Sequence, residues 1–366
     1  MRLRLTQAST FTTTEVCPTR APRGNSAFRK AVFLVLSLLS TALAAEALES
    51  MDYRLVGERP NATGAATTVS FSLYVIDIDA IDDVKQRFSV DIFVNIAWSD
   101  PRLALPEDEQ SGLNRTLPLN EIWTPRGLIV NDRGLSPQLP LVANVDDQGN
   151  VQYRQRFSGE LAVDLDLREF PFDRQHLPID IISYQYSPDN LHFSSSTGIS
   201  RDEREFSAEG WRFKMLDPEI GEFTIPAAGI VRPRLTYVIE AQRKLGYYLL
   251  TMFLPVSLII FMSWTAFWLH PNLAPTRIAI STASIFSLIA FGFSLRLSLP
   301  LVSYPTRADI FVAGCKLLVF LALGFAVIGS RWANEDQMAR ALRLNAVARW
   351  VYVGLFGLVA AIAITI

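Results

Sequence analysis

The segment LLTMFLPVSLIIFMSWTAFWL, residues 249–269, holds 21 residues without a charge. A bilayer core about 30 Å thick is crossed by roughly 17–25 apolar residues in a helix. Three further apolar runs follow, at 278–295, 310–330 and 350–366, and only Lys316 interrupts them. Four such runs in the last third of the chain exceed what a soluble core uses. The sequence therefore predicts four transmembrane helices, at about 247–269, 276–297, 306–330 and 347–366, within a membrane domain of residues 245–366.

Composition excludes several classes of function. The chain has 366 residues, of which 19% are charged, and a net charge of −2. This near-neutral balance argues against nucleic acid as a partner. The two cysteines, Cys17 and Cys315, cannot make a disulfide framework or a Cys-rich metal site. No nucleophile–base pair and no metal-ligand spacing occurs, and the three histidines are scattered, so we expect no enzyme, cofactor or metal.

The N-terminus resembles a secretory signal. Arg29 and Lys30 precede the apolar stretch 31–43, and small residues follow. We assign residues 1–45 to a signal peptide and N-terminal extension. The mature N-terminus then lies outside the cytoplasm, and four spans return the C-terminus to the same side. The Arg-rich stretch 331–349 falls inside, in agreement with the positive-inside rule. These features predict a multi-pass protein of the cell (inner) membrane whose N-terminal domain and C-terminus are extracellular or periplasmic.

Residues 46–244 carry little helix signal. Apolar and polar residues alternate in 69–75 and 88–94, and again in 154–166, and turn clusters such as 187–190 separate such runs. Many short strands at regular spacing predict a β-sandwich. The fold class is thus an extracellular β-sandwich followed by a four-helix transmembrane bundle.

The second span carries a stripe of small and aromatic residues. Successive members are four, three, four, three and four positions apart, which keeps them on one helical face; they are Ala279, Ala283, Phe286, Ala290, Phe293 and Leu297. Small residues can form a packing face against neighbouring helices. Alternatively the stripe faces a pore, and Phe286 and Phe293 form hydrophobic constrictions. The residues alone leave both interpretations open.

Several motifs, in order along the chain, resemble those of one family. They are Trp98–Leu103, Ile122–Pro125, Asp166–Gln175, Gly246–Leu249 with Ser263–Trp264, Pro275–Arg277, and Arg296–Tyr304. Together they resemble the pentameric ligand-gated ion channels, or Cys-loop receptors, and the membrane part is most similar to glycine and GABA receptors. Val163 and Leu177 replace the two cysteines that normally close the signature loop, here residues 163–177. Fewer than 20 residues join spans three and four. Both departures resemble prokaryotic members.

The resemblance implies a pentamer around a central pore, here a homopentamer. The expected partners are four further copies, membrane lipid, a small-molecule or proton agonist, and permeant ions. The implied pore-lining residues are Ala279, Thr282, Ala283, Phe286, Ala290, Phe293 and Leu297.

Charge near the pore ends favours anions. Cation-selective relatives usually carry Glu just before the basic position that opens the pore helix, whereas Pro275 and Thr276 precede Arg277 here. No acid lies between Leu269 and Arg307, and Arg296 adds a cation at the outer end. We expect a chloride channel, with these four residues (Pro275, Thr276, Arg277 and Arg296) setting selectivity. A cation-selective or proton-gated channel, or a poorly conducting membrane sensor, stays open, as does a simple anchoring role for Arg277.

The resemblance also implies a coupling set between the two domains. Arg243 occupies the family's buried arginine position before span one, and its expected partners are Asp173 and either Asp82 or Asp83. Phe170, Pro171 and Phe172 of the signature loop are expected to meet the linker that contains Pro300. A static salt bridge is the alternative.

The agonist pocket is expected between neighbouring extracellular domains. The residues at the matching positions are Phe93, Asn95, Leu128, Arg154, Tyr184, Phe223 and Arg232. The aromatic cage for a cationic amine is incomplete. Asn95 replaces the arginine that grips a carboxylate in glycine and GABA receptors, and Arg154 could serve instead. Proton sensing by His176 and the stretch 202–205 is a further option, and ordinary surface positions are the alternative.

Overall fold

A computed structural model describes residues 56–195, 206–226, 228–297, 302–335 and 337–365. All of them belong to one compact unit, Arg54–Ile366. The predicted signal peptide lies outside the described residues.

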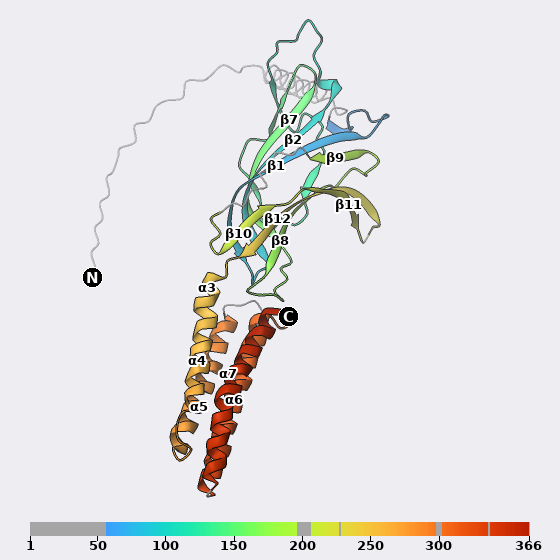
Figure 1. Cartoon of the computed structure of the whole chain (residues 1–366). Coiled ribbons are helices and arrows are strands. Elements are labelled where there is room, and N and C mark those ends of the chain that lie inside the picture. The colour runs from blue at the N-terminus through green and yellow to red at the C-terminus, as the bar shows by residue number, and fades with distance from the viewer. Residues whose placement is uncertain (1–55, 196–205, 227, 298–301, 336, 366) are drawn as a thin grey trace, which may run out of the picture. The chain divides into compact units, whose positions relative to one another are not determined.

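Two antiparallel-rich sheets form the extracellular part (Figure 1). The larger sheet has the order β3-β6-β7-β2-β1-β9, and β5 pairs with β7. Its strands are β1 (Thr67–Asp82), β2 (Arg87–Ser99), β3 (Arg115–Pro118), β5 (Ser136–Pro137), β6 (Val142–Val145), β7 (Asn150–Ala162) and β9 (Leu191–Ser195). A short 3-10 helix, η1 (Pro101–Leu103), follows β2.

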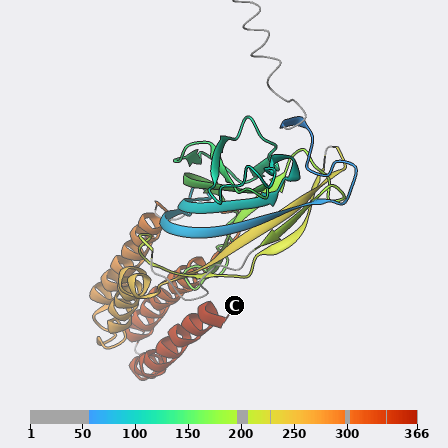
Figure 2. The same ribbon diagram turned by 90° about the horizontal axis from the view of Figure 1, so that it is seen from above.

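The smaller sheet has the order β10-β12-β8-β4, and β11 pairs with β12 as a hairpin. Its strands are β4 (Gly127–Ile129), β8 (Arg174–Ser183), β10 (Trp211–Met215), β11 (Glu219–Ile225) and β12 (Ile230–Arg243). In Figure 2 the blue and teal strands of the larger sheet form one layer and the yellow strands of the smaller sheet form the other.

Alternation along the strands places the core between the two sheets. In β1 the residues Val69, Phe71, Leu73 and Val75 are buried, whereas the intervening polar residues are not fully buried. Tyr237 of β12 donates from its hydroxyl to the carbonyl of Phe71, 3.2 Å away, and so joins the two layers. The predicted β-sandwich is confirmed.

Four helical segments follow, each long and apolar enough to cross a membrane. The first is built from α3 (Gly246–Tyr248), the π-helical turn η2 (Leu249–Phe253) and α4 (Leu254–Thr265); then come α5 (Ala274–Leu297), α6 (Arg307–Asn334) and α7 (Met338–Thr365). The π turn lies just before Pro255, which has no N–H to donate to the carbonyl four residues back.

The helix ends differ from the hydropathy-based bounds. The last helix begins at Met338, whereas the apolar pattern placed its start near 347. The first ends at Thr265 instead of 269, and the third continues to Asn334. Hydropathy bounds the part of a helix that lies in the hydrocarbon core. The helical backbone itself can continue beyond that part into water, as it does in the Arg-rich turns here.

We expect Trp123→Ala to lower the melting temperature of the purified protein. Trp123 is fully buried, its ring stacks edge-on against Trp98, and its indole N–H donates to the Tyr186 hydroxyl over 2.7 Å. Loss of a buried tryptophan costs about 3–5 kcal/mol. Leu113→Ala, at an exposed position, is the control for thermal unfolding. An equal, small shift in both variants would show that Trp123 does not hold this part of the core.

Candidate functional site: a coupling cluster and an exposed helix face

Arg243, the last residue of β12, sits at the centre of a buried ionic cluster. Its Nε and Nη2 donate to the two carboxylate oxygens of Asp173, at 2.8 and 3.0 Å. Its Nη1 and Nη2 donate to Asp83, at 3.0 and 3.2 Å, and Nη1 also donates to the Tyr248 hydroxyl at 3.0 Å. The five N–H donors of the guanidinium thus match five bonds.

These bonds join segments that are far apart in sequence. Asp83 lies in the turn between β1 and β2, and Asp173 lies in the signature loop just before β8. Tyr248 belongs to α3 at the start of the first span. The Arg243 side chain is only 3% exposed, Asp173 is 1% exposed and Asp83 is 22% exposed. The cluster is therefore a buried junction between the extracellular sheets and the membrane helices.

Aromatic rings surround the guanidinium. Its carbon lies 4.1 Å from the ring centre of Trp211, 4.9 Å from that of Phe170 and 5.6 Å from that of Tyr248. Such contacts favour a cation over a neutral group. Burial by itself would lower the pKa of Arg243, but the bonds to Asp173 and Asp83 raise it above its ordinary value, so the arginine stays charged.

For Asp83 the effect of burial on the pKa exceeds that of the ionic contacts. Burial raises the pKa of its carboxyl, the Arg243 contacts lower it in part, and the neighbouring Asp173 raises it further. The net effect is a raised pKa, chiefly because burial removes the carboxyl from water.

The signature loop also caps the third span. The N–H groups of Arg307 and Ala308, in the first turn of α6, donate to the carbonyls of Arg168 and Phe170 at 2.9 and 3.1 Å. The first N–H groups of a helix have no hydrogen-bond acceptor within the helix. The loop supplies two of these acceptors. Asp309 and Thr306 complete a capping box at the same end.

Two side-chain contacts reinforce this loop-to-helix junction. The Tyr304 hydroxyl accepts a bond from the N–H of Leu167 at 3.0 Å, and the Arg168 guanidinium lies 4.6 Å from the Tyr304 ring centre. Arg307 donates to Glu169 at 2.9 Å. The loop residues 167–170 thus contact the segment that leads into α6.

The structure distinguishes between the two aspartates offered as partners of Arg243. Asp83 binds it, whereas Asp82 pairs with Lys85 at 3.1 Å on the surface of the turn. Phe172 stacks near Phe253 of the first span, and Phe170 stacks against Tyr248. Pro171 lies between these two residues and is buried. Pro300 lies outside the described residues.

On α5, one face is exposed and the opposite face is packed. The exposed residues include five of the predicted stripe: Ala279, Ala283, Phe286, Ala290 and Phe293. Phe286 and Phe293 are each 67% exposed. Thr282 is half-buried, and Pro275 and Thr276 are exposed at the start of the helix. The side chain of Leu297 is outside the described set.

Arg277 points away from the exposed stripe. Its side chain is fully buried, and it donates to the carbonyl of Ala266 at 3.0 Å and to the Asn345 side chain at 2.7 Å. Its guanidinium also lies against Gly329 of α6, where an added Cβ would be 3.3 Å from Nη1. The Arg277 guanidinium therefore binds the helices around it and does not belong to the exposed face of α5.

The predicted agonist residues fall into groups on the two sheets. On the larger sheet, Asn95 of β2 lies directly opposite Arg154 of β7, and Phe93 lies two residues along β2. On the smaller sheet, Phe223 pairs with Arg232 in the β11–β12 hairpin. The Asn95 side-chain oxygen and the Arg232 Nε are buried without a hydrogen-bond partner among the described residues.

Leu128 and Tyr184 line one cavity of about 390 Å³ in the extracellular part. Arg126, which precedes β4 and has a positive φ of 51°, lines it too. Arg126 had no role in the sequence-based prediction, and no spacing rule would have placed it in this cavity. Among the residues that the structure describes, no cluster of His, Cys, Asp and Glu could hold a metal ion.

Comparison with known proteins identifies the family. Residues 44–218 match the model of the neurotransmitter-gated ion-channel ligand binding domain, and residues 252–349 match that of the neurotransmitter-gated ion-channel transmembrane region. The chain therefore belongs to the Cys-loop family of pentameric ligand-gated channels, which are not enzymes. It is a multi-pass membrane protein with an extracellular N-terminal domain.

One curated relative is a gamma-aminobutyric acid receptor subunit beta-like protein of Drosophila melanogaster. The two sequences are 29% identical over 294 residues, which cover 75% of this chain and 58% of the relative. The match thus spans little more than half of the relative's length.

We expect Arg243→Ala to abolish gating or assembly. The substitution leaves Asp83 and Asp173 buried without their cation, and breaking such a group costs about 3–5 kcal/mol. Arg243→Lys keeps the charge but has fewer donors, so it should retain assembly with impaired gating. Surface expression and whole-cell current separate the two effects. Wild-type current at wild-type surface density in Arg243→Ala would remove the coupling role.

A second prediction concerns pH. Because the pKa of Asp83 is raised in the folded protein, its ionised form costs stability above its ordinary pKa, and this cost is relieved as pH falls through the folded value. The wild type should therefore gain melting temperature on acidification relative to Asp83→Asn. Hydrogen bonds from Lys85 lower the pKa of Asp82, so its small contribution has the opposite sign. Melting temperatures of wild type, Asp83→Asn and Asp82→Asn between pH 7 and 4 test this; the same trend in both variants would contradict it.

Proposed function

We propose that five copies of this chain form a ligand-gated ion channel whose pore is lined by α5 and whose permeant ion is chloride. The exposed stripe on α5 carries this proposal. In the described residues of α5, buried Arg277, Ser281, Ser284 and Leu288 face the bundle, and the stripe faces out. In a pentamer, five such stripes would enclose a pore, with the Phe286 and Phe293 rings as hydrophobic constrictions.

Anion selectivity is supported by charge. The sequence from His270 to Thr306 contains two arginines, Arg277 and Arg296, and no acidic residue. Arg277 would act through its field, because its side chain is buried behind the pore face. Pro275 and Thr276 would form the narrow inner end, where cation channels of this family carry a ring of acids.

The agonist is proposed to bind between neighbouring extracellular domains and to carry a carboxylate. Candidate contacts lie on both sheets, as an interface site requires: Leu128, Tyr184, Phe223 and Arg232 on one side, and Phe93, Asn95 and Arg154 on the other. Arg126, Arg154 and Arg232 offer guanidinium groups, which bind carboxylates in a bidentate geometry. The name of the Drosophila melanogaster relative supports the same ligand chemistry, since gamma-aminobutyric acid carries a carboxylate.

The reversal potential in a chloride gradient tests the central part of the proposal. The full chain is reconstituted in planar bilayers with a tenfold chloride gradient. Protons, small amines and amino acids are then applied in turn as candidate agonists. A chloride-selective pore should reverse near the chloride potential, about 59 mV from zero. A reversal that follows Na⁺ or K⁺ would replace the anion channel by a cation channel of the same fold.

A poorly conducting membrane sensor is the second candidate. The exposure of both Phe286 and Phe293 favours it, because two aromatic rings in series would oppose hydration of the pore. Saturable binding of a panel member without current or liposome ion flux would support the sensor and exclude the channel.

A further inference from the structure

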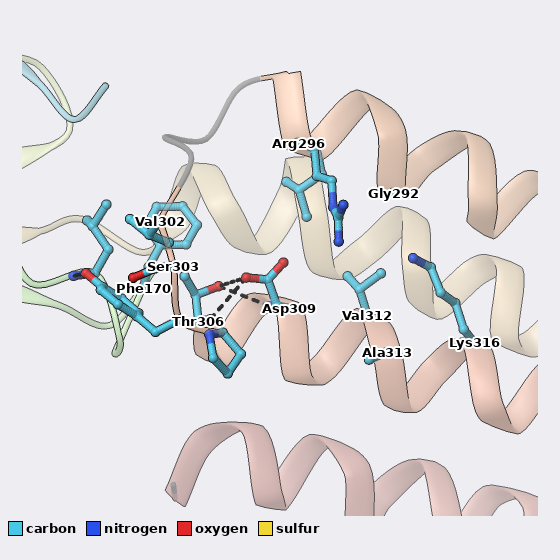
Figure 3. Close-up of a pocket in the computed structure, with 14 residues that line it drawn as sticks. Phe170, Gly292, Arg296, Val302, Ser303, Thr306, Asp309, Val312, Ala313 and Lys316 are labelled. Atoms are coloured by element: carbon cyan, nitrogen blue, oxygen red, sulfur yellow. Dashed lines mark hydrogen bonds between the residues drawn. The ribbon is translucent and has the colours of Figure 1, made fainter. Parts of the chain in front are cut away.

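A cavity of about 380 Å³ lies where α5 and α6 meet, near the outer ends of both helices (Figure 3). Arg296 of α5 and Lys316 of α6 line it, together with Asp309, Val312 and Gly292. Figure 3 shows the guanidinium of Arg296 and the ammonium of Lys316 turned into the same space. Arg296, predicted to act at the pore mouth, thus also lines a cavity beside α6.

Two cations converge here, and neither has an acidic partner in the part of the chain that the structure describes. Among the described residues, Arg296 and Lys316 make no ion pair and no hydrogen bond. Asp309 is the one acid among the described lining residues, and its Oδ2 accepts from the backbone and hydroxyl of Thr306 at 3.0 and 2.9 Å. The cavity therefore has two positive charges for one negative charge, and that negative charge already caps α6.

Lys316 lies far along a membrane-spanning helix for a charged residue. It lies nine residues after the start of α6 at Arg307, about 14 Å along the helix axis. Charged side chains inside a membrane span are rare and normally have a partner. An added Cβ at Gly292 would lie 3.0 Å from the Lys316 Nζ, so the glycine leaves room for this ammonium beside α5.

A second copy of the chain cannot supply the missing negative charge from its spans. Asp309 is the single acidic residue in the sequence of the four candidate spans. A ligand that carries its own negative charge would neutralise the excess.

An apolar cavity of about 470 Å³ shares part of its lining with the charged one. Lys316 and Ala313 line both cavities, and Ile285, Leu288, Leu317 and Phe320 line the apolar one. A charged cavity beside an apolar cavity matches a molecule with an anionic head and a hydrocarbon chain.

We propose that this pair of cavities binds an anionic phospholipid, with its phosphate on Arg296 and Lys316 and an acyl chain along Leu317 and Phe320. The charged cavity is also lined by Leu167 and Phe170 of the signature loop and by Tyr304. The bound lipid would therefore contact the residues that join the extracellular domain to α6. This inference does not depend on ion permeation or on the identity of the agonist.

Native mass spectrometry of the full-length protein tests the site. The protein is extracted from vesicles of phosphatidylcholine and phosphatidylglycerol, and the retained lipids are counted. We expect retention of phosphatidylglycerol over phosphatidylcholine, and a loss of about fivefold in this preference in Lys316→Gln and in Arg296→Gln. Arg343→Gln, an exposed cation of α7 outside both cavities, should behave as wild type.

Ala313→Trp separates the site from a general charge effect. It keeps both cations and fills the junction of the two cavities, so it should also abolish the preference. No preference in the wild type, or an unchanged preference in the Lys316→Gln/Arg296→Gln double variant, would overturn the proposal. Displacement of the lipid by millimolar glycerol 3-phosphate, with no effect of Ala313→Trp, would assign the cations to a free anion and also overturn it.

Discussion

One buried guanidinium shared between two carboxylates is the interaction on which the rest of this structure depends. Arg243 ends the last strand, and Asp173, Asp83 and Tyr248 bring the signature loop, the β1–β2 turn and the first span to it. Removing charges from water is costly unless each is paired and hydrogen-bonded. The geometry meets that condition, since every donor of the guanidinium has an acceptor. A displacement of any of the three segments would break at least one of these bonds.

The second junction uses the backbone. The loop carbonyls of Arg168 and Phe170 accept from the first turn of α6, so the extracellular loop and the helix terminus satisfy each other. Arg243 binds the start of the first span and the loop binds the start of the third. α5, whose exposed stripe we propose to line the pore, lies between these spans in the sequence. Its first turn is fixed by the bonds of Arg277 to Ala266 and Asn345. A ligand-gated channel needs a physical connection between its ligand-binding domain and its membrane helices, and these contacts provide one.

Much of this organisation could be predicted from the sequence, because it rests on periodicity. Alternation gave the sandwich strands, and uncharged length gave the spans. The stripe spacing identified the exposed face of α5. The carboxylate partner of Arg243 was harder to predict, because Asp82 and Asp83 are adjacent and only the geometry of the turn directs one of them inward. Periodicity also says nothing about where a long side chain ends, so the burial of Arg277 was missed. Trp211, Tyr248 and Arg126 were missed as site residues because contacts between distant segments leave no local pattern.

The central claim is that Asp83 and Tyr248 act through the same guanidinium. A double-mutant cycle on thermal unfolding of the purified protein, with Asp83→Asn, Tyr248→Phe and the double variant, tests it most directly. Because both residues bind Nη1 of Arg243, at 3.0 Å each, the shift in melting temperature of the double variant should differ clearly from the sum of the single shifts. Additive shifts would show that the turn and the first span are held independently, and would contradict the account.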